Sequence, residues 1–79
     1  MLQLVLYTTD HCTLCDEALE LLLNMPELVG HQLMVADITA DDELLDRYGE
    51  RIPVLACHER QLDAPFDAED VRVFMAGCH

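Results

Sequence analysis

Two cysteines three positions apart, Cys12 and Cys15, are the residues of this chain best suited to chemistry. They lie in the segment TTDHCTLCDEA, with a histidine before the first cysteine and two acids after the second. A thiol pair at this spacing can form a redox-active disulfide, bind a metal ion or simply pack. If a strand ends before the pair and a helix begins after it, the amides of the first helical turn face the first sulfur and favour its thiolate. The second sulfur then returns to nearly the same face, within disulfide reach, so this context favours redox chemistry.

The pattern of apolar residues predicts the elements that must hold the pair. Leu2 to Tyr7 is apolar apart from one glutamine, which is typical of a strand covered on both faces. From Thr13 the apolar residues recur at helical spacing, and Pro26 stops the run. His31 to Ile38 has strand character again, and TADDELLDRYG predicts a capped helix closed by glycine. The two strands therefore form a parallel strand-helix-strand unit.

The second half of the chain predicts an antiparallel pair and a last helix. IPVLAC indicates a short strand with proline at its start, and HER indicates a turn into a brief strand at Gln61 to Asp63. Strands so close in sequence must pair antiparallel. Asp67 can cap a helix over Ala68 to Ala76, which Gly77 ends. Its predicted buried stripe is Val71, Phe74 and Met75. With neither repeat nor linker, residues 1–79 are expected to form a single domain.

The charge balance restricts the partners. The chain has 79 residues, with four arginines, no lysine and 16 acids, for a net charge of -12 at pH 7. Such a charge repels nucleic acid and anionic membrane surfaces, and we predict neither as a partner. It favours a cationic or neutral partner surface, or serves only to keep the protein soluble.

The opening MLQLVLY has no basic segment or cleavage site, so we expect a cytoplasmic monomer, in which Cys12 and Cys15 are catalytic or metal-binding.

Three segments, LVLYTTDHCTLCDEALELL, RYGERIPVLAC and LDAPFDAEDVRVFM, resemble the glutaredoxin branch of the thioredoxin superfamily over nearly the whole chain. The resemblance implies an α/β, thioredoxin-like fold: a four-stranded mixed sheet of order 2-1-3-4 flanked by three helices, in the sequence β-α-β-α-β-β-α. It implies Cys12 as nucleophile, Cys15 as resolving thiol and Pro53 in the cis form facing the disulfide. A cis proline there leaves the backbone of Ile52 exposed, to pair with a bound peptide or glutathione like an added strand.

The chain departs from the glutaredoxin pattern at three places. Thr9 stands where many glutaredoxins have a lysine or arginine, three residues before the first cysteine. Leu14 replaces an aromatic residue, and Ala64 and Pro65 replace a Gly-Gly pair that contacts glutathione. A protein disulfide and glutathione therefore both remain candidate substrates. No bound cofactor is implied, and glutathione would act as a co-substrate.

Substrate binding is assigned to six residues around the pair: His11, Leu14, Arg51, Ile52, Pro53 and Asp67. The Ile52 backbone and Asp67 line up with glutathione contacts of the family, as does Cys12. A protonated His11 would lower the pKa of Cys12, against the opposite effect of the neighbouring acids. Arg51, next to the proline loop, is a candidate for the cation that the site otherwise lacks.

The resulting prediction is a thiol-disulfide oxidoreductase. The thiolate of Cys12 attacks a disulfide to give a mixed disulfide, which Cys15 resolves. One alternative is a binding module that holds an extended segment in the same groove without turnover. Another is a metal or iron-sulfur protein that uses Cys12 and Cys15.

The metal alternative draws on three adjacent cysteine and histidine pairs: His11-Cys12, Cys57-His58 and Cys78-His79. The second and third lack the close spacing of zinc knuckles, and we expect the fold to bring together only the first cysteine pair and the Pro53 loop. Cys57 is accordingly interpreted as a small core or turn residue, and Cys78 as a loose thiol.

Overall fold

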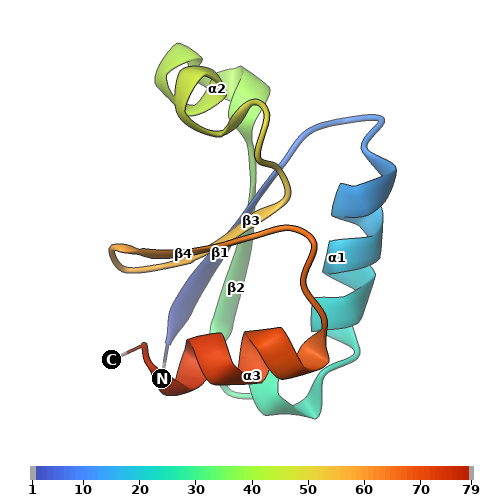
Figure 1. The fold of residues 1–79 in the computed structure, drawn as a ribbon, viewed down its shortest axis with the longest axis vertical. Helices are drawn as coiled ribbons and strands as arrows, with labels where there is room; N and C mark the ends of the chain where they lie inside the picture. Colours follow the sequence, from blue (N-terminus) through green and yellow to red (C-terminus); the bar gives the residue numbers. More distant parts are fainter. Residues whose placement is uncertain (1, 79) are drawn as a thin grey trace.

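Four strands form one mixed sheet in the computed structural model, which describes residues 2–78 (Figure 1). The strands are β1 (Gln3–Thr8), β2 (Gln32–Asp37), β3 (Val54–Cys57) and β4 (Arg60–Asp63). The helices are α1 (Thr13–Leu23), α2 (Asp42–Tyr48) and α3 (Ala68–Ala76), with 3₁₀ turns η1 (Pro26–Leu28) and η2 (Ile38–Ala40).

The order of the strands across the sheet is β2-β1-β3-β4. Strand β1 pairs in parallel with β2 and antiparallel with β3, and β3 pairs antiparallel with β4. The order of elements along the chain is β-α-β-α-β-β-α. Both the predicted sheet order and the predicted fold class are therefore confirmed.

The two faces of the sheet carry cores of different size. On one face Leu4 and Leu6 of β1 and Leu55 of β3 are fully buried against α1 and α3. On the other face Val54 of β3 packs with Tyr48, the last residue of α2. The alternation along β3 places Val54 and Leu55 on opposite faces, as strand geometry requires. Figure 1 shows α1 and α3 close to the sheet and α2 beyond one end of it.

Side-chain caps fix where the helices begin. Asp41 accepts a hydrogen bond from the Glu43 amide at 2.8 Å at the start of α2. Asp67 and Asp70 form a reciprocal capping box at the start of α3. The predicted bounds of α3 and its Asp67 cap agree with the structure. Gly49 also ends α2 as predicted, but with right-handed backbone angles.

One predicted strand is shorter than expected at its end. β2 ends at Asp37, and Ile38, which is 1% exposed, belongs to η2 instead. The Asp37 carboxylate accepts hydrogen bonds from the Thr39 amide at 2.9 Å and the Thr39 hydroxyl at 2.7 Å. Such local bonds compete with strand pairing and turn the chain.

Within residues 2–78, no helix has the length and apolar content needed to cross a membrane. The longest, α1, has 11 residues, against about 20 for a membrane-spanning helix.

Candidate active site

Cys12 and Cys15 form a disulfide at the start of α1, with their Cα atoms 5.2 Å apart. Cys12 is the N-cap of the helix, in extended conformation. Its sulfur accepts a hydrogen bond from the backbone amide of Cys15 at 3.2 Å. The preceding residue, His11, has a positive φ of 58° and turns the chain between β1 and the helix. The strand-to-helix junction predicted for the pair is therefore present.

The two sulfurs of this pair differ in exposure. Cys15 is 2% exposed, whereas Cys12 is half-buried. An external disulfide can reach Cys12 first, and the hydrogen bond that the Cys15 amide donates to the Cys12 sulfur favours a thiolate there. This asymmetry fits a nucleophile at Cys12 and a resolving thiol at Cys15.

Pro53 lies across from α1 and follows a cis peptide bond with Ile52. The amide N–H of Ile52 donates to the carbonyl of Tyr48 at 3.2 Å. Within residues 2–78 no hydrogen bond to the Ile52 carbonyl is found. The Ile52 amide is already hydrogen-bonded, so we predict that a bound segment would donate a hydrogen bond to the Ile52 carbonyl.

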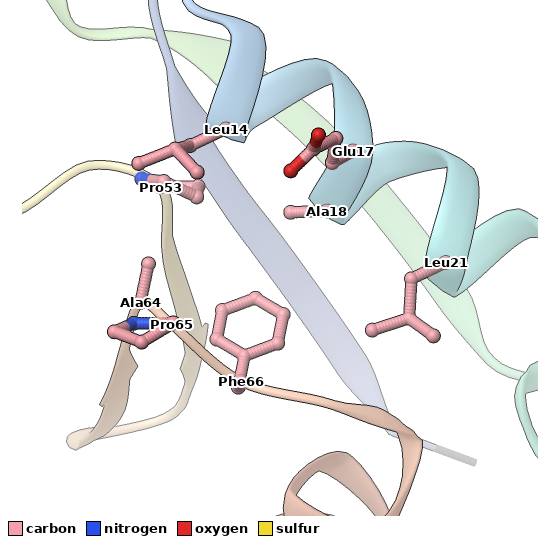
Figure 2. Close-up of a pocket in the computed structure, with 8 residues that line it drawn as sticks. All are labelled: Leu14, Glu17, Ala18, Leu21, Pro53, Ala64, Pro65 and Phe66. Atoms are coloured by element: carbon pink, nitrogen blue, oxygen red, sulfur yellow. The ribbon is translucent and has the colours of Figure 1, made fainter.

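An apolar groove begins one residue before Cys15 and runs along α1 (Figure 2). Its walls are Leu14, Glu17, Ala18 and Leu21 of α1 and, opposite, Pro53, Ala64, Pro65 and Phe66. Figure 2 shows the Phe66 ring and the Glu17 side chain turned into this space. The groove holds about 90 Å³, less than the roughly 150 Å³ of a benzene-binding cavity, so it suits one aliphatic side chain. Glu17 is its one charged lining residue among those described.

Arg51 is engaged by a carboxylate. Its guanidinium donates to both oxygens of Asp63, at 3.0 and 2.8 Å, and to the side chain of Gln61 at 2.7 Å. It also lies 5.4 Å from the centre of the Tyr48 ring. The hydrogen bonds from Arg51 hold the pKa of Asp63 below its usual range. A substrate carboxylate would have to displace Asp63, so Arg51 is no ready substitute for the missing cation.

The other predicted residues lie around the groove and the pair. Leu14 is 57% exposed and lines the groove beside Pro53. His11 is exposed in the loop before Cys12. Asp67 accepts the amide of Asp70 at 2.9 Å, so its carboxylate already caps α3.

Sequence reasoning found Leu14 and Pro53 but missed the other residues of both walls of the groove. Glu17 and Leu21 follow Leu14 at helical spacing, which could have shown that they share its face. Phe66 and the cis Ala64-Pro65 peptide form the opposite wall. The sequence reveals the Ala-Pro pair, but not that it brings the Phe66 ring toward α1.

The interpretation of Cys57 as a core residue is confirmed, whereas the interpretation of Cys78 as a loose thiol was wrong. Cys57 and Cys78 form a second disulfide, with Cα atoms 6.4 Å apart, and Cys78 is 5% exposed rather than loose. Cys57 at the end of β3 and Cys78, two residues after α3, meet in the main core, although they are 21 positions apart in sequence. The fold therefore brings together more than the first pair and the Pro53 loop.

The same region contains potential metal ligands. Cys57, His58 and Cys78 have ligand atoms within 4.8 Å of one another. Within residues 2–78 they are the only such group of three or more, and it includes neither Cys12 nor Cys15. His79, from the third predicted cysteine-histidine pair, lies outside the described residues.

Comparison with known proteins agrees with the fold and the cysteine pair. Residues 3–75 match the model of the Glutaredoxin-like domain (DUF836). The X-ray structure of the structural genomics target protein XcR50 from X. campestris is 36% identical, with a TM-score of 0.81 over 96% of this chain and 99% of that one. The solution structure of XcR50 has a TM-score of 0.78 over 100% and 97%. No curated protein matches significantly. The chain belongs to the glutaredoxin-like domain family.

Proposed function

We propose that this protein is a thiol-disulfide oxidoreductase that reduces disulfides through Cys12 and Cys15. The observation that carries the proposal is the asymmetry of the pair. Cys12 is accessible at a helix N-terminus and accepts an amide hydrogen bond, whereas Cys15 is 2% exposed. An accessible thiolate beside a shielded partner can attack and then be resolved within the same protein.

The reaction proceeds through a mixed disulfide. The Cys12 thiolate attacks one sulfur of the substrate disulfide, so that a new sulfur-sulfur bond forms and one substrate thiolate leaves. The Cys15 thiolate then attacks the Cys12 sulfur, which closes the Cys12–Cys15 disulfide and releases the second substrate thiolate. The protein is oxidised and the substrate gains two electrons. External thiols of the cytoplasm would restore the reduced pair, and a monomer suffices for each step.

The groove supports a protein disulfide as substrate in preference to glutathione. Glutathione carries two carboxylates, whereas the groove is apolar apart from Glu17. Arg51 already binds Asp63, and the chain as a whole carries a charge of -12. A disulfide flanked by an aliphatic side chain would instead place that side chain against Leu14, Pro53 and Phe66.

The proposal is tested by assays of Cys12→Ser and Cys15→Ser against the unaltered protein. Reduction of insulin and of a glutathione mixed disulfide are measured. We expect the unaltered protein to reduce insulin, with a smaller rate on glutathione, and Cys12→Ser to lose both activities. Cys15→Ser should accumulate a mixed disulfide with the substrate, visible as a mass increase that a reductant removes. Activity that persists in Cys12→Ser, or no activity in the unaltered protein, would contradict the proposal.

A further inference from the structure

A second group of reactive side chains lies apart from the groove. Cys57 ends β3, His58 is the first residue of the two-residue loop to β4, and Cys78 follows α3. Their ligand atoms lie within 4.8 Å of one another. His58 has a positive φ of 55°, a backbone angle that residues other than glycine rarely adopt. This angle turns the hairpin directly after Cys57. Neither the proposed reaction nor the groove uses this group.

Reduction would turn this group into a set of zinc ligands. Two thiolates and a neutral imidazole form a donor set that Zn²⁺ prefers, and a fourth position stays open for water or another ligand. Zinc bonds of about 2.0–2.3 Å in a tetrahedron place neighbouring ligand atoms about 3.6–3.8 Å apart. On reduction the two sulfurs, no longer bonded to each other, would move apart toward that spacing, and the imidazole already has a nitrogen within 4.8 Å of both.

The surroundings of the group leave room for an ion. Its three residues line a surface pocket together with Glu59, Arg60 and Gly77. The Arg60 guanidinium lies 5.3 Å from the Phe74 ring centre and donates to the Phe74 carbonyl at 3.5 Å, beside Gly77. Both sulfurs are buried, and the strongly acidic chain attracts cations to the pocket.

We propose that Cys57, His58 and Cys78 form a zinc site in the reduced protein, and that zinc and the Cys57–Cys78 disulfide exclude each other. Two equivalents of a small thiol reduce the disulfide to two cysteine thiols and are themselves oxidised to a disulfide. Zn²⁺ then displaces the two thiol protons and accepts the imidazole lone pair. In the reverse direction, an external disulfide takes two electrons from the two bound thiolates. The Cys57–Cys78 bond closes, Zn²⁺ leaves, and the external disulfide departs as two thiolates.

The test uses the full chain with Cys12→Ser and Cys15→Ser, which removes the first pair. The reduced protein is titrated with Co²⁺ under anaerobic conditions, and thiolate-to-cobalt charge-transfer absorption is recorded before Zn²⁺ displaces the cobalt. We expect one equivalent to bind. A further Cys57→Ser change should abolish the absorption. His58→Asn, which tolerates the positive φ, should weaken binding by at least about tenfold.

Two controls keep the result interpretable. His11→Asn is the matched variant, because His11, like His58, is exposed, has a positive φ (58°) and neighbours a cysteine, yet lies outside the ligand group. It should leave binding unchanged. The second control needs no change at the site: the same protein with its disulfide intact should not give the charge-transfer band.

Several results would overturn the proposal. One is a reduced protein without the charge-transfer band, and another is a band that survives Cys57→Ser. Equal affinity in His58→Asn and in His11→Asn would remove His58 from the site. A disulfide that small thiols do not open in the folded protein would also overturn it, since zinc needs the free thiolates.

Discussion

The two cysteine pairs of this molecule use the same bond in different settings. Cys12 and Cys15 are three positions apart at the start of one helix, and one of their sulfurs is accessible. Cys57 and Cys78 are 21 positions apart, join a strand end to a helix end, and are both buried in the main core. Opening the first pair therefore affects one helical turn, whereas opening the second releases a connection across the fold.

The charged neighbours of the two pairs differ as well. Arg51, near the proline loop on the first side, is neutralised by Asp63. Arg60, beside the second pair, makes no ion pair with another described residue and lies over the Phe74 ring instead. The cation near the first pair is thus held by a carboxylate, whereas the cation near the second pair is held by a carbonyl and an aromatic ring.

The largest expected effect is on stability. Reducing Cys57–Cys78 in the Cys12→Ser, Cys15→Ser protein should lower the free energy of unfolding by about 3 kcal/mol, because a long loop is no longer closed in the unfolded chain. Reducing Cys12–Cys15 in a Cys57→Ser, Cys78→Ser protein should cost about 2 kcal/mol, because that loop is short. Urea unfolding with a chelator present measures both.

Each protein is compared with itself in two redox states, so the cost of its serine substitutions cancels. Equal effects of the two reductions, or a larger effect for Cys12–Cys15 than for Cys57–Cys78, would contradict this expectation. Zinc added to the reduced Cys12→Ser, Cys15→Ser protein should raise its free energy of unfolding by about 2.7 kcal/mol when free zinc is at 100 times the dissociation constant.

Local sequence signals were enough to predict most of the fold. Apolar spacing, the Asp67 cap and the proline just before β3 each act within a few residues, so the sequence displays them directly. The bounds of α3 and the sheet order agreed with the structure. Ile38 was misplaced because the hydrogen bonds of Asp37 to Thr39 turn the chain, and residue propensities do not reveal which local bond wins.

The candidate site was predictable only where one segment supplies it. Cys12, Cys15 and Leu14 lie on one helix turn, and their spacing places them together. Partners from distant segments were missed, because tertiary packing decides them. The sequence does not show that Arg51 reaches Asp63, nor that Cys57 meets Cys78, since each pairing depends on how β3, β4 and α3 pack.

The second largest effect concerns the groove beside the first pair. Leu14→Asp should lower kcat/KM roughly tenfold for a peptide disulfide with an aliphatic neighbour, because the exposed leucine would no longer bury apolar surface with the substrate. Leu23→Asp is the matched control, since Leu23 is on the same helix, is 71% exposed and lies outside the groove. Similar losses in both variants would show that the groove does not select the substrate.

A smaller effect is expected from restoring the missing cation. Thr9→Arg should lower the pKa of the Cys12 thiol in the reduced protein and raise activity on a glutathione mixed disulfide several-fold, because a cation supports both the thiolate and a carboxylate. Thiolate absorbance against pH and steady-state assays measure the two changes. Gln3→Arg adds the same charge at the opposite end of β1, near the second pair, and should change neither. An unchanged pKa in Thr9→Arg would contradict the expectation.

The smallest effect comes from freeing Arg51. Asp63→Asn removes the carboxylate that accepts two hydrogen bonds from Arg51, and should slightly lower stability at neutral pH, as for other exposed ion pairs. The folded pKa of Asp63 lies below its usual range, so the stabilisation is complete above the unfolded value near 4 and is lost as the pH falls through the folded value. The difference between the two proteins in urea unfolding should therefore shrink below about pH 4.

The same variant tests why the first pair lacks a cation. With Asp63 neutral, Arg51 can turn to a substrate carboxylate, and activity on a glutathione mixed disulfide should rise while insulin reduction stays the same. Glu43→Gln is the control, because it removes an exposed carboxylate from the ion pair with Arg47 on α2. A rise in both variants would trace the gain to overall charge. A rise in Asp63→Asn alone would mean that the Asp63 carboxylate, rather than the absence of an arginine, keeps glutathione from the site.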